Sequence, residues 1–226
     1  MVPPLVADID GTLTRPDKSI DLRVLDPIRT WEAPVVIATG KAFPYPVALC
    51  EFLGIEIAVI AENGGVVFLE AADEVAYNGD PEGAAAVAAE YREAGHELGW
   101  GAVDPVNRWR ETEVAVSRDQ PLEPLVEIAE RHGLAVVDTG YAYHVKSPAV
   151  DKSRGLEAVA GLLGHEPSEF AAVGDSENDA ELFERAGRSF AVANADGAAR
   201  AAADTVTDGS FADGFLEALE RLHPSA

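Results

Sequence analysis

Short apolar segments alternate with helix-compatible segments in the first and last thirds of the chain. Each apolar segment runs into a polar or glycine-containing turn. The apolar segments lie at residues 5–7, 35–38, 57–61, 170–173 and 190–193. The sequence between them predicts helices at about residues 21–31, 43–53, 151–163, 177–185 and 212–222. Because continuous apolar strands that alternate with helices are typical of a parallel sheet with both faces covered, these parts of the chain predict an α/β domain.

The middle of the chain predicts a different order of helices and strands. In chain order it predicts a helix at residues 82–95, a strand at 112–117, a helix at 123–132, and strands at 134–138 and 141–146. We interpret this block as a small α+β domain inserted into the sheet domain. The predicted division is a core domain with a Rossmann-like parallel sheet at residues 1–78 and 149–226, and an inserted cap domain at residues 79–148. The hinges are expected near Gly79 and Pro148.

Polar side chains follow the predicted core strands at the point where each strand ends. These side chains are Asp8, Thr39, Asn63, Asp175 and Asn194. In open α/β sheets, ligands bind outside the carboxyl ends of the strands. The sequence therefore predicts a site at this edge of the sheet.

Two aspartates belong to the first motif of this edge, Asp-Ile-Asp-Gly-Thr at residues 8–12. One carboxylate can attack phosphorus while its neighbour donates a proton to the leaving oxygen and then activates water. The alternative is a polar strand end with a helix cap at Asp10. The pair alone is a common pattern, but the longer motif directly after an apolar strand favours the catalytic interpretation of Asp8 and Asp10.

Two further motifs offer phosphate-binding groups. Thr39 and Gly40 lie in the turn after the second strand, where a hydroxyl and free backbone N–H groups can bind phosphate oxygens. Lys152 opens a predicted helix, although the positive N-terminus of a helix disfavours cations. Neutralisation of a phosphoryl group explains that placement. The alternatives are a helix-capping threonine and a solvent-facing lysine.

An acidic cluster at residues 175–179 predicts a magnesium site. Mg²⁺ prefers near-octahedral oxygen ligands, usually one or two carboxylates together with phosphate and water. Asp175 and Asp179 lie four residues apart at a predicted helix start, so they can present oxygens to one ion. A purely capping role for Asp175 is the alternative, but it does not account for Asn178 and Asp179.

The four motifs together, in this order and spacing, resemble those of the haloacid dehalogenase superfamily of phosphotransferases. The resemblance covers about residues 5–194. It implies that Asp8 is the nucleophile and Asp10 the general acid and base. The Mg²⁺ ligands that it implies are Asp8, the backbone carbonyl of Asp10, and Asp175, with Asp179 completing or orienting the set. The phosphate-binding residues that it implies are Thr39, Gly40, Lys152 and Asn178.

The resemblance also suggests a substrate. The insertion is similar to the mobile α/β cap of the family's second structural class. A compact acidic chain with Asp-Lys-Ser-Arg-Gly at residues 151–155 is most similar to the archaeal members that hydrolyse phosphoglycolate. Sugar-phosphate or broad-range phosphatases share the four motifs and are the first alternative. A non-catalytic phosphometabolite-binding module is the second, but binding alone would not need Asp10.

Cationic residues of the predicted cap are candidates for choosing the substrate. They are Arg108, Arg110, His144 and Lys146. Each could meet a carboxylate such as that of glycolate. The alternative is that they are surface charges which balance a very acidic chain.

The chain is strongly acidic along its whole length. It has 40 acidic and 17 basic residues, which gives a net charge of −23. Such a field repels nucleic acid and anionic membranes, because phosphate binding by proteins depends on Lys and Arg. We expect a small phosphorylated metabolite as the partner, and a protein of a halophilic archaeon. No basic or hydrophobic leader opens the sequence, which predicts a cytoplasmic protein. A monomer or homodimer is expected.

The charge generates a first testable prediction. The melting temperature should rise between low and molar KCl, because the screening length falls from about 10 Å at 0.1 M to about 3 Å at 1 M salt and weakens the self-repulsion. Calorimetry across a KCl series measures this shift. An unchanged melting temperature would contradict the halophilic interpretation.

Overall fold

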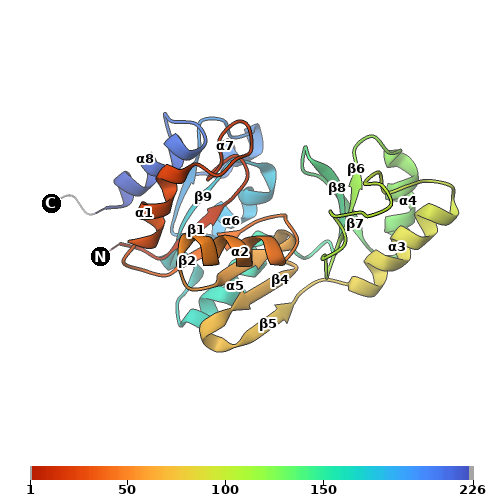
Figure 1. Ribbon diagram of the computed structural model, residues 1–226, viewed down its shortest axis with the longest axis horizontal. Coiled ribbons are helices and arrows are strands. Elements are labelled where there is room, and N and C mark those ends of the chain that lie inside the picture. The colour runs from red at the N-terminus through yellow and green to blue at the C-terminus, as the bar shows by residue number, and fades with distance from the viewer. Residues whose placement is uncertain (1, 224–226) are drawn as a thin grey trace.

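Two lobes make up the protein, each built around its own sheet (Figure 1). The structure, a computed structural model, describes residues 2–223. The larger lobe contains an eight-stranded sheet and the smaller lobe a three-stranded sheet. Of the helices described in residues 2–223, none combines the length and apolar character that crossing a bilayer requires.

The larger sheet has the strand order β11-β10-β9-β1-β2-β3-β4-β5. Its parallel part consists of β1 (Leu5–Asp8), β2 (Val35–Ala38), β3 (Ala58–Ala61), β9 (Ala171–Gly174), β10 (Arg188–Ala191) and β11 (Thr205–Val206). The first strand lies between β2 and β9, so the carboxyl ends of these three strands meet at one edge. The strand expected at residues 190–193 begins and ends two residues earlier, and the other predicted core strands are confirmed.

An antiparallel hairpin extends this sheet beyond β3, so the sheet is mixed rather than purely parallel. Its strands are β4 (Val66–Leu69) and β5 (Glu74–Tyr77). The sequence analysis did not predict either strand. The outer strand β5 is largely exposed and carries no continuous apolar pattern, which is why its signal is weak.

Helices cover both faces of the larger sheet, as predicted. They are α1 (Leu25–Arg29), α2 (Pro44–Leu53), α5 (Lys152–Leu163), α6 (Ala180–Arg185), α7 (Gly197–Ala202) and α8 (Ala212–Leu222). Successive side chains of a strand point to opposite faces. Accordingly, Leu5 and Ala7 pack in the apolar cluster that contains Phe215 of α8, whereas Val6 packs in the cluster that contains Leu156 of α5. Nearly every side chain of the central strands is therefore buried.

Two predicted helices begin as 3₁₀ turns. The helix expected at residues 21–31 divides into η1 (Leu22–Val24) and α1, and the Asp21 side chain caps the first turn by accepting from Arg23 N. The helix expected at residues 177–185 likewise opens with η5 (Glu177–Asp179) before α6. The second of these turns matters for the site, because it fixes Asp179.

The smaller lobe follows the predicted order of helices and strands. It contains α3 (Pro81–Glu93), β6 (Val114–Ser117), α4 (Leu122–Arg131), β7 (Ala135–Asp138) and β8 (Ala142–Lys146). The sheet is antiparallel with the order β6-β8-β7, and α3 and α4 pack against it around Tyr91 and Leu125. This lobe is the cap.

Backbone amides of the cap meet a core carboxylate where the lobes join. Glu62 accepts hydrogen bonds from Glu111 N, Thr112 N and Thr112 Oγ1. A Cβ on Gly79 would lie 2.5 Å from Thr112 Cβ, so only glycine fits this crossing. The hinges expected near Gly79 and Pro148, and the domain boundaries at residues 79 and 148, stay predictions.

Candidate active site

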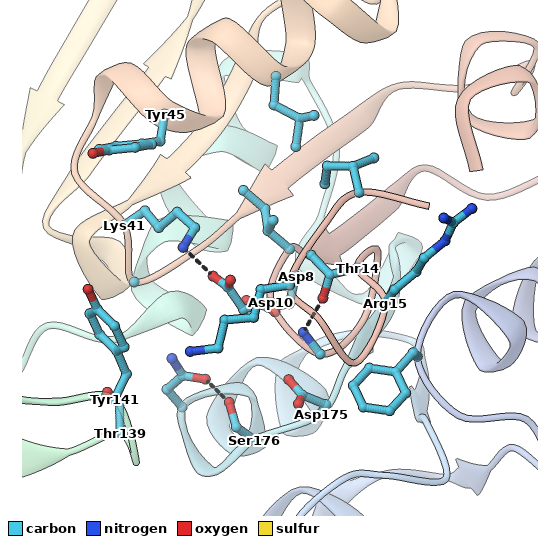
Figure 2. A pocket seen from close by; sticks show the side chains of 18 of the residues that line it. Asp8, Asp10, Thr14, Arg15, Lys41, Tyr45, Thr139, Tyr141, Asp175 and Ser176 are labelled. Carbon is cyan, nitrogen blue, oxygen red and sulfur yellow. Dashed lines mark hydrogen bonds and ion pairs between the residues drawn. The ribbon is translucent and has the colours of Figure 1, made fainter. Parts of the chain in front are cut away.

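Asp8 and Asp10 lie where β1 meets the edge of the sheet (Figure 2). Asp8 is the last residue of β1 and only 4% exposed. The chain then turns sharply, with Gly11 at φ +79° and its N–H bonded to Thr14 Oγ1 at 2.9 Å. Leu13 N donates back to Ile9 O at 2.9 Å, which closes the turn. The turn leaves both carboxylates on the wall of one cleft.

The ammonium group of Lys152 is buried among acidic side chains. Lys152 is the first residue of α5 and is 0% exposed. Its Nζ donates to Asp8 Oδ1 at 2.6 Å, to Asp179 Oδ1 at 2.6 Å and to Asn178 Oδ1 at 3.3 Å. Burial alone would lower the pKa of Lys152, but its attraction to Asp179 and Asp8 raises the pKa above its usual value. Lys152 is therefore a fixed positive charge beside Asp8.

Asp179 uses its two oxygens in different ways. While Oδ1 accepts from Lys152, Oδ2 accepts from the backbone N–H groups of Asp175 at 3.0 Å and Ser176 at 3.2 Å. These bonds hold the turn between β9 and η5 in place. Both oxygens are already bonded to protein groups, so the geometry favours the orienting role among the two that the sequence suggested. Direct contact of Asp179 with a metal stays a prediction.

Three carboxylates converge at this turn. One oxygen from each of Asp8, Asp175 and Asp179 lies within 4.8 Å of the others. Burial raises the pKa of Asp8 to about 7. The charge of Lys152 opposes this shift, and the neighbouring carboxylates add to it. Burial and the charge of Asp8 raise the pKa of Asp175 to about 8. Lys152 alone does not balance this cluster, so a divalent cation fits the donor set.

Gly11 and Asn194 shape the space around Asp175. A Cβ on Gly11 would lie 1.9 Å from Asp175 Oδ2, so only glycine admits the carboxylate. Asn194 Nδ2 donates to Gly11 O at 3.0 Å, and its Oδ1 accepts from Phe211 N at 2.6 Å. Asn194 thus lies at the predicted edge and ties the turn after β1 to the loop before α8.

The turn after β2 contributes Thr39, Gly40 and Lys41. Thr39 is 1% exposed, and its Oγ1 accepts from Lys41 N at 3.1 Å. The Lys41 ammonium lies 2.9 Å from Asp10 Oδ2, and this ion pair is visible in Figure 2. No role was expected for Lys41 from the sequence. Its position directly after Thr39-Gly40, in a chain with few lysines, was the available signal.

A cleft of about 620 Å³ runs between the core and the cap. The site residues that line it are Asp8, Asp10, Gly40, Asp175 and Asn178. Thr39, Lys152 and Asp179 are buried behind this wall. The structure therefore brings the predicted site residues together, and their individual roles stay predictions.

The cap side of the cleft separates the four cationic candidates. Arg110 and His144 line the cleft, together with Tyr141. Arg108 instead lies over the ring of Trp109, 5.7 Å from its centroid. Lys146 is buried and donates to Val150 O. Only the first two are therefore placed to meet a substrate among the four.

Proteins similar to this chain over its full length are phosphatases. A phosphoglycolate phosphatase from Natronomonas pharaonis is 74% identical over 221 residues, which cover 98% of each chain. A phosphoglycolate phosphatase from Haloarcula marismortui is 60% identical over 217 residues, or 96% of each chain. Both relatives are haloarchaeal, which confirms the expectation of a halophilic archaeal protein.

Solved structures and a family model agree with this relationship. A crystal structure from Thermoplasma acidophilum matches with a TM-score of 0.84 and 26% identity and covers 98% of each chain. The family model of haloacid dehalogenase-like hydrolases matches residues 5–88 and 123–219. The chain therefore belongs to the haloacid dehalogenase-like hydrolase family.

Proposed function

We propose that this protein is a phosphatase that hydrolyses 2-phosphoglycolate to glycolate and phosphate. The observation that carries the chemistry is the Asp8 carboxylate, held 2.6 Å from the buried Lys152 ammonium with Asp10 two residues further on. The substrate is supported by the phosphoglycolate phosphatases that this chain resembles over its full length.

Asp8 is the proposed nucleophile. Because its Oδ1 is bonded to Lys152, Oδ2 is the oxygen that attacks phosphorus. The bond from phosphorus to the glycolate oxygen breaks, and Asp10 gives that oxygen a proton. Asp10 then takes a proton from water, whose oxygen attacks the phosphorus of the aspartyl phosphate and releases Asp8 as a carboxylate. Lys41 fixes the direction of the Asp10 side chain at the cleft wall.

Four residues are proposed to hold the phosphoryl group. Lys152 supplies a positive charge that does not have to be reorganised during the reaction. Thr39 offers its hydroxyl and Gly40 a backbone N–H at the turn after β2. Asn178 lies on the same wall, where its Oδ1 accepts from Lys152 and Ser176 Oγ.

Mg²⁺ is the proposed cofactor. Asp8, the backbone carbonyl of Asp10, and Asp175 would hold it, and Asp179 would orient this set through the Asp175 N–H. When bound, the ion would neutralise phosphoryl oxygens and the crowded carboxylates. The space that Gly11 leaves beside Asp175 and the raised pKa values of Asp8 and Asp175 support this assignment.

The wider proposal is a cytoplasmic enzyme with a small phosphorylated metabolite as its partner and no nucleic acid or membrane partner, acting as a monomer or homodimer. Closure of the cap over the cleft would exclude bulk water from the aspartyl phosphate until Asp10 activates one molecule. The hinge contacts around Glu62 and Thr112 are compatible with such a motion, because they lie beside the chain crossings.

Removal of the nucleophile tests the proposal directly. Asp8→Asn should lower kcat on 2-phosphoglycolate by at least about 10⁴-fold, because the amide cannot form the acyl phosphate. Phosphate release is measured with Mg²⁺ in molar KCl for wild type and variant across 2-phosphoglycolate, phosphoglycerates, sugar phosphates and nucleotides. Asp73→Asn is the matched control, because Asp73 is exposed and adopts a left-handed conformation that asparagine tolerates.

Each outcome of this panel has one meaning. Selectivity for 2-phosphoglycolate supports the whole proposal. Equal or better turnover of sugar phosphates would keep the chemistry and replace the substrate. An active Asp8→Asn protein would refute the nucleophile.

Binding of Mg²⁺ should release protons. Without metal, the pKa values of Asp8 and Asp175 are raised to about 7 and about 8, so below pH 7 both carboxyls hold protons that a cation must displace. The apparent affinity should therefore rise from pH 6 to about pH 9 and level off above it. Titration calorimetry in buffers of different ionisation enthalpy counts the protons. Binding that is independent of pH, with no proton release, would contradict the metal assignment.

Two lysine variants separate a buried charge from an exposed one. Lys152→Met should lower the free energy of unfolding by about 3 kcal/mol, because it leaves Asp8 and Asp179 buried without their partner. Lys41→Met removes the same charge from the half-exposed pair with Asp10 and should cost less than about 1 kcal/mol. Urea unfolding at fixed KCl measures both. Equal losses in the two variants would show that Lys152 is not the structural centre of the site.

A further inference from the structure

Glu113 is a buried carboxylate that the proposed chemistry does not use. It immediately precedes β6, and its side chain is 1% exposed. Oε1 accepts from Arg110 Nη1 and, at 2.8 Å, from His144 Nδ1, while Oε2 accepts from Asn63 Nδ2 at 3.1 Å. Burial alone would raise the pKa of Glu113, but His144 and Arg110 lower it to about 2. Glu113 is therefore an ionised side chain that fixes two others.

The two cap side chains that Glu113 fixes both line the cleft. Arg110 also donates from Nη1 to Gly40 O at 3.0 Å and from Nε to Val106 O at 3.2 Å. Its Nη2 has no protein partner within residues 2–223, and neither does His144 Nε2. Neither atom is among the fully buried polar atoms that lack a partner, so both are accessible from the cleft. The arrangement leaves two nitrogen atoms available to the space of the cleft.

The donors of this cluster suit a carboxylate. The ion pair with Glu113 uses Nη1 of the Arg110 guanidinium and leaves Nη2 for a ligand. A hydrogen bond from this cation to a carboxylate oxygen joins two ionised groups, and such bonds are roughly twice as strong as those between neutral groups. A ring of His144 that carries both protons adds a donor at Nε2, because Nδ1 already faces Glu113. A neutral hydroxyl at the same place offers no negative charge to the guanidinium.

The position of Arg110 also limits the length of the ligand. Its bond to Gly40 O places the guanidinium beside the turn proposed to hold phosphate. A carboxylate that reaches Arg110 must therefore lie close to the phosphoryl group. In 2-phosphoglycolate a single methylene carbon separates the ester oxygen from the carboxylate, which satisfies this requirement.

A chain of side-chain hydrogen bonds joins this cluster to the nucleophile. Asn63 Oδ1 accepts from Asn178 Nδ2 at 3.0 Å, and Asn178 Oδ1 accepts from Lys152, which is bonded to Asp8. Asn63 itself has φ +54° and comes from the core, whereas Glu113 belongs to the cap. In this arrangement the hydrogen bonds connect the cap cluster to the reacting carboxylate through side chains alone.

We propose that Arg110 and His144 bind the carboxylate of the substrate and that Glu113 is the positioning residue that orients both. The inference rests on the proposed function, and it identifies which residues select a phosphorylated short-chain carboxylate over other phosphomonoesters. Asn63 sets the position of this pair relative to Asp8.

The test compares two substrates of nearly equal size. 2-Hydroxyethyl phosphate carries a neutral hydroxyl where 2-phosphoglycolate carries its carboxylate. Arg110→Met and His144→Asn should each lower kcat/KM for 2-phosphoglycolate by about 100-fold, chiefly through KM, and change kcat/KM for 2-hydroxyethyl phosphate by less than about threefold. In His144→Asn, the amide can still donate to Glu113 from the position of Nδ1, so the variant removes only the second nitrogen.

Two further variants test positioning and specificity of the effect. Glu113→Gln should lower the ratio of the two kcat/KM values by about tenfold, because Arg110 and His144 lose the charge that aligns them. Arg108→Met is the matched control. It removes the same charge two residues before Arg110, from a side chain that lies over Trp109, and it should leave the ratio unchanged. Binding of the product glycolate should weaken in Arg110→Met, and titration calorimetry with glycolate measures the carboxylate site without turnover.

The outcomes distinguish this inference from the proposed function. The inference is supported if the ratio of kcat/KM for 2-phosphoglycolate to kcat/KM for 2-hydroxyethyl phosphate falls in the Arg110, His144 and Glu113 variants and stays unchanged in the Arg108 variant. An equal fall on both substrates, or a ratio that none of the three variants changes, overturns it while the phosphatase assignment stands. If wild type itself does not prefer 2-phosphoglycolate, the proposed substrate fails before the variants are considered.

Discussion

The buried ammonium group of Lys152 is the interaction on which the rest of the structure depends. It joins Asp8 and Asp179, which are 144 and 27 residues distant in sequence, and both contacts are 2.6 Å. Burying either the ammonium group or one of these carboxylates without its partner would be strongly unfavourable. The first strand, the helix after the cap and the turn after β9 must therefore assemble together. The same contact leaves Asp175 with little compensating charge from the protein, which is compatible with the proposed cation.

The topology of the chain couples the cap to this contact. The cap is inserted between β5 and α5, and α5 begins at Lys152, so the chain that returns from the cap leads directly into the site. A Cβ on Gly64 would lie 1.9 Å from Asp151 O, which shows how tightly the returning segment packs against the turn after β3. We expect a movement of the cap to act on the segment that leads into Lys152, and therefore to affect both the proposed carboxylate site and the charges around Asp8.

The sequence predicts the elements whose signal is local. Apolar strands that run into polar turns locate β1, β2, β3 and β9, and the parallel arrangement brings their ends together. The outer strand β5 escapes prediction because it is exposed, whereas β4 has a buried apolar run, Val66–Leu69, that was an available signal. Glu113 escapes for a different reason. Arg110 lies only three residues away, but His144 and Asn63 lie 31 and 50 residues away, and no spacing rule connects a single glutamate to a histidine and an asparagine in other elements.

High salt explains why the site depends on buried contacts. In molar salt the field of a surface with a net charge of −23 is screened within about 3 Å, so long-range attraction or repulsion of an anionic substrate contributes little. Buried pairs are screened much less. Lys18, Lys41 and Lys152, three of the four lysines, accordingly lie on the cleft wall or behind it. The acidic exterior and the lysines of the cleft are thus compatible: the first acts on solvent and salt, and the second act only on a ligand that has already entered.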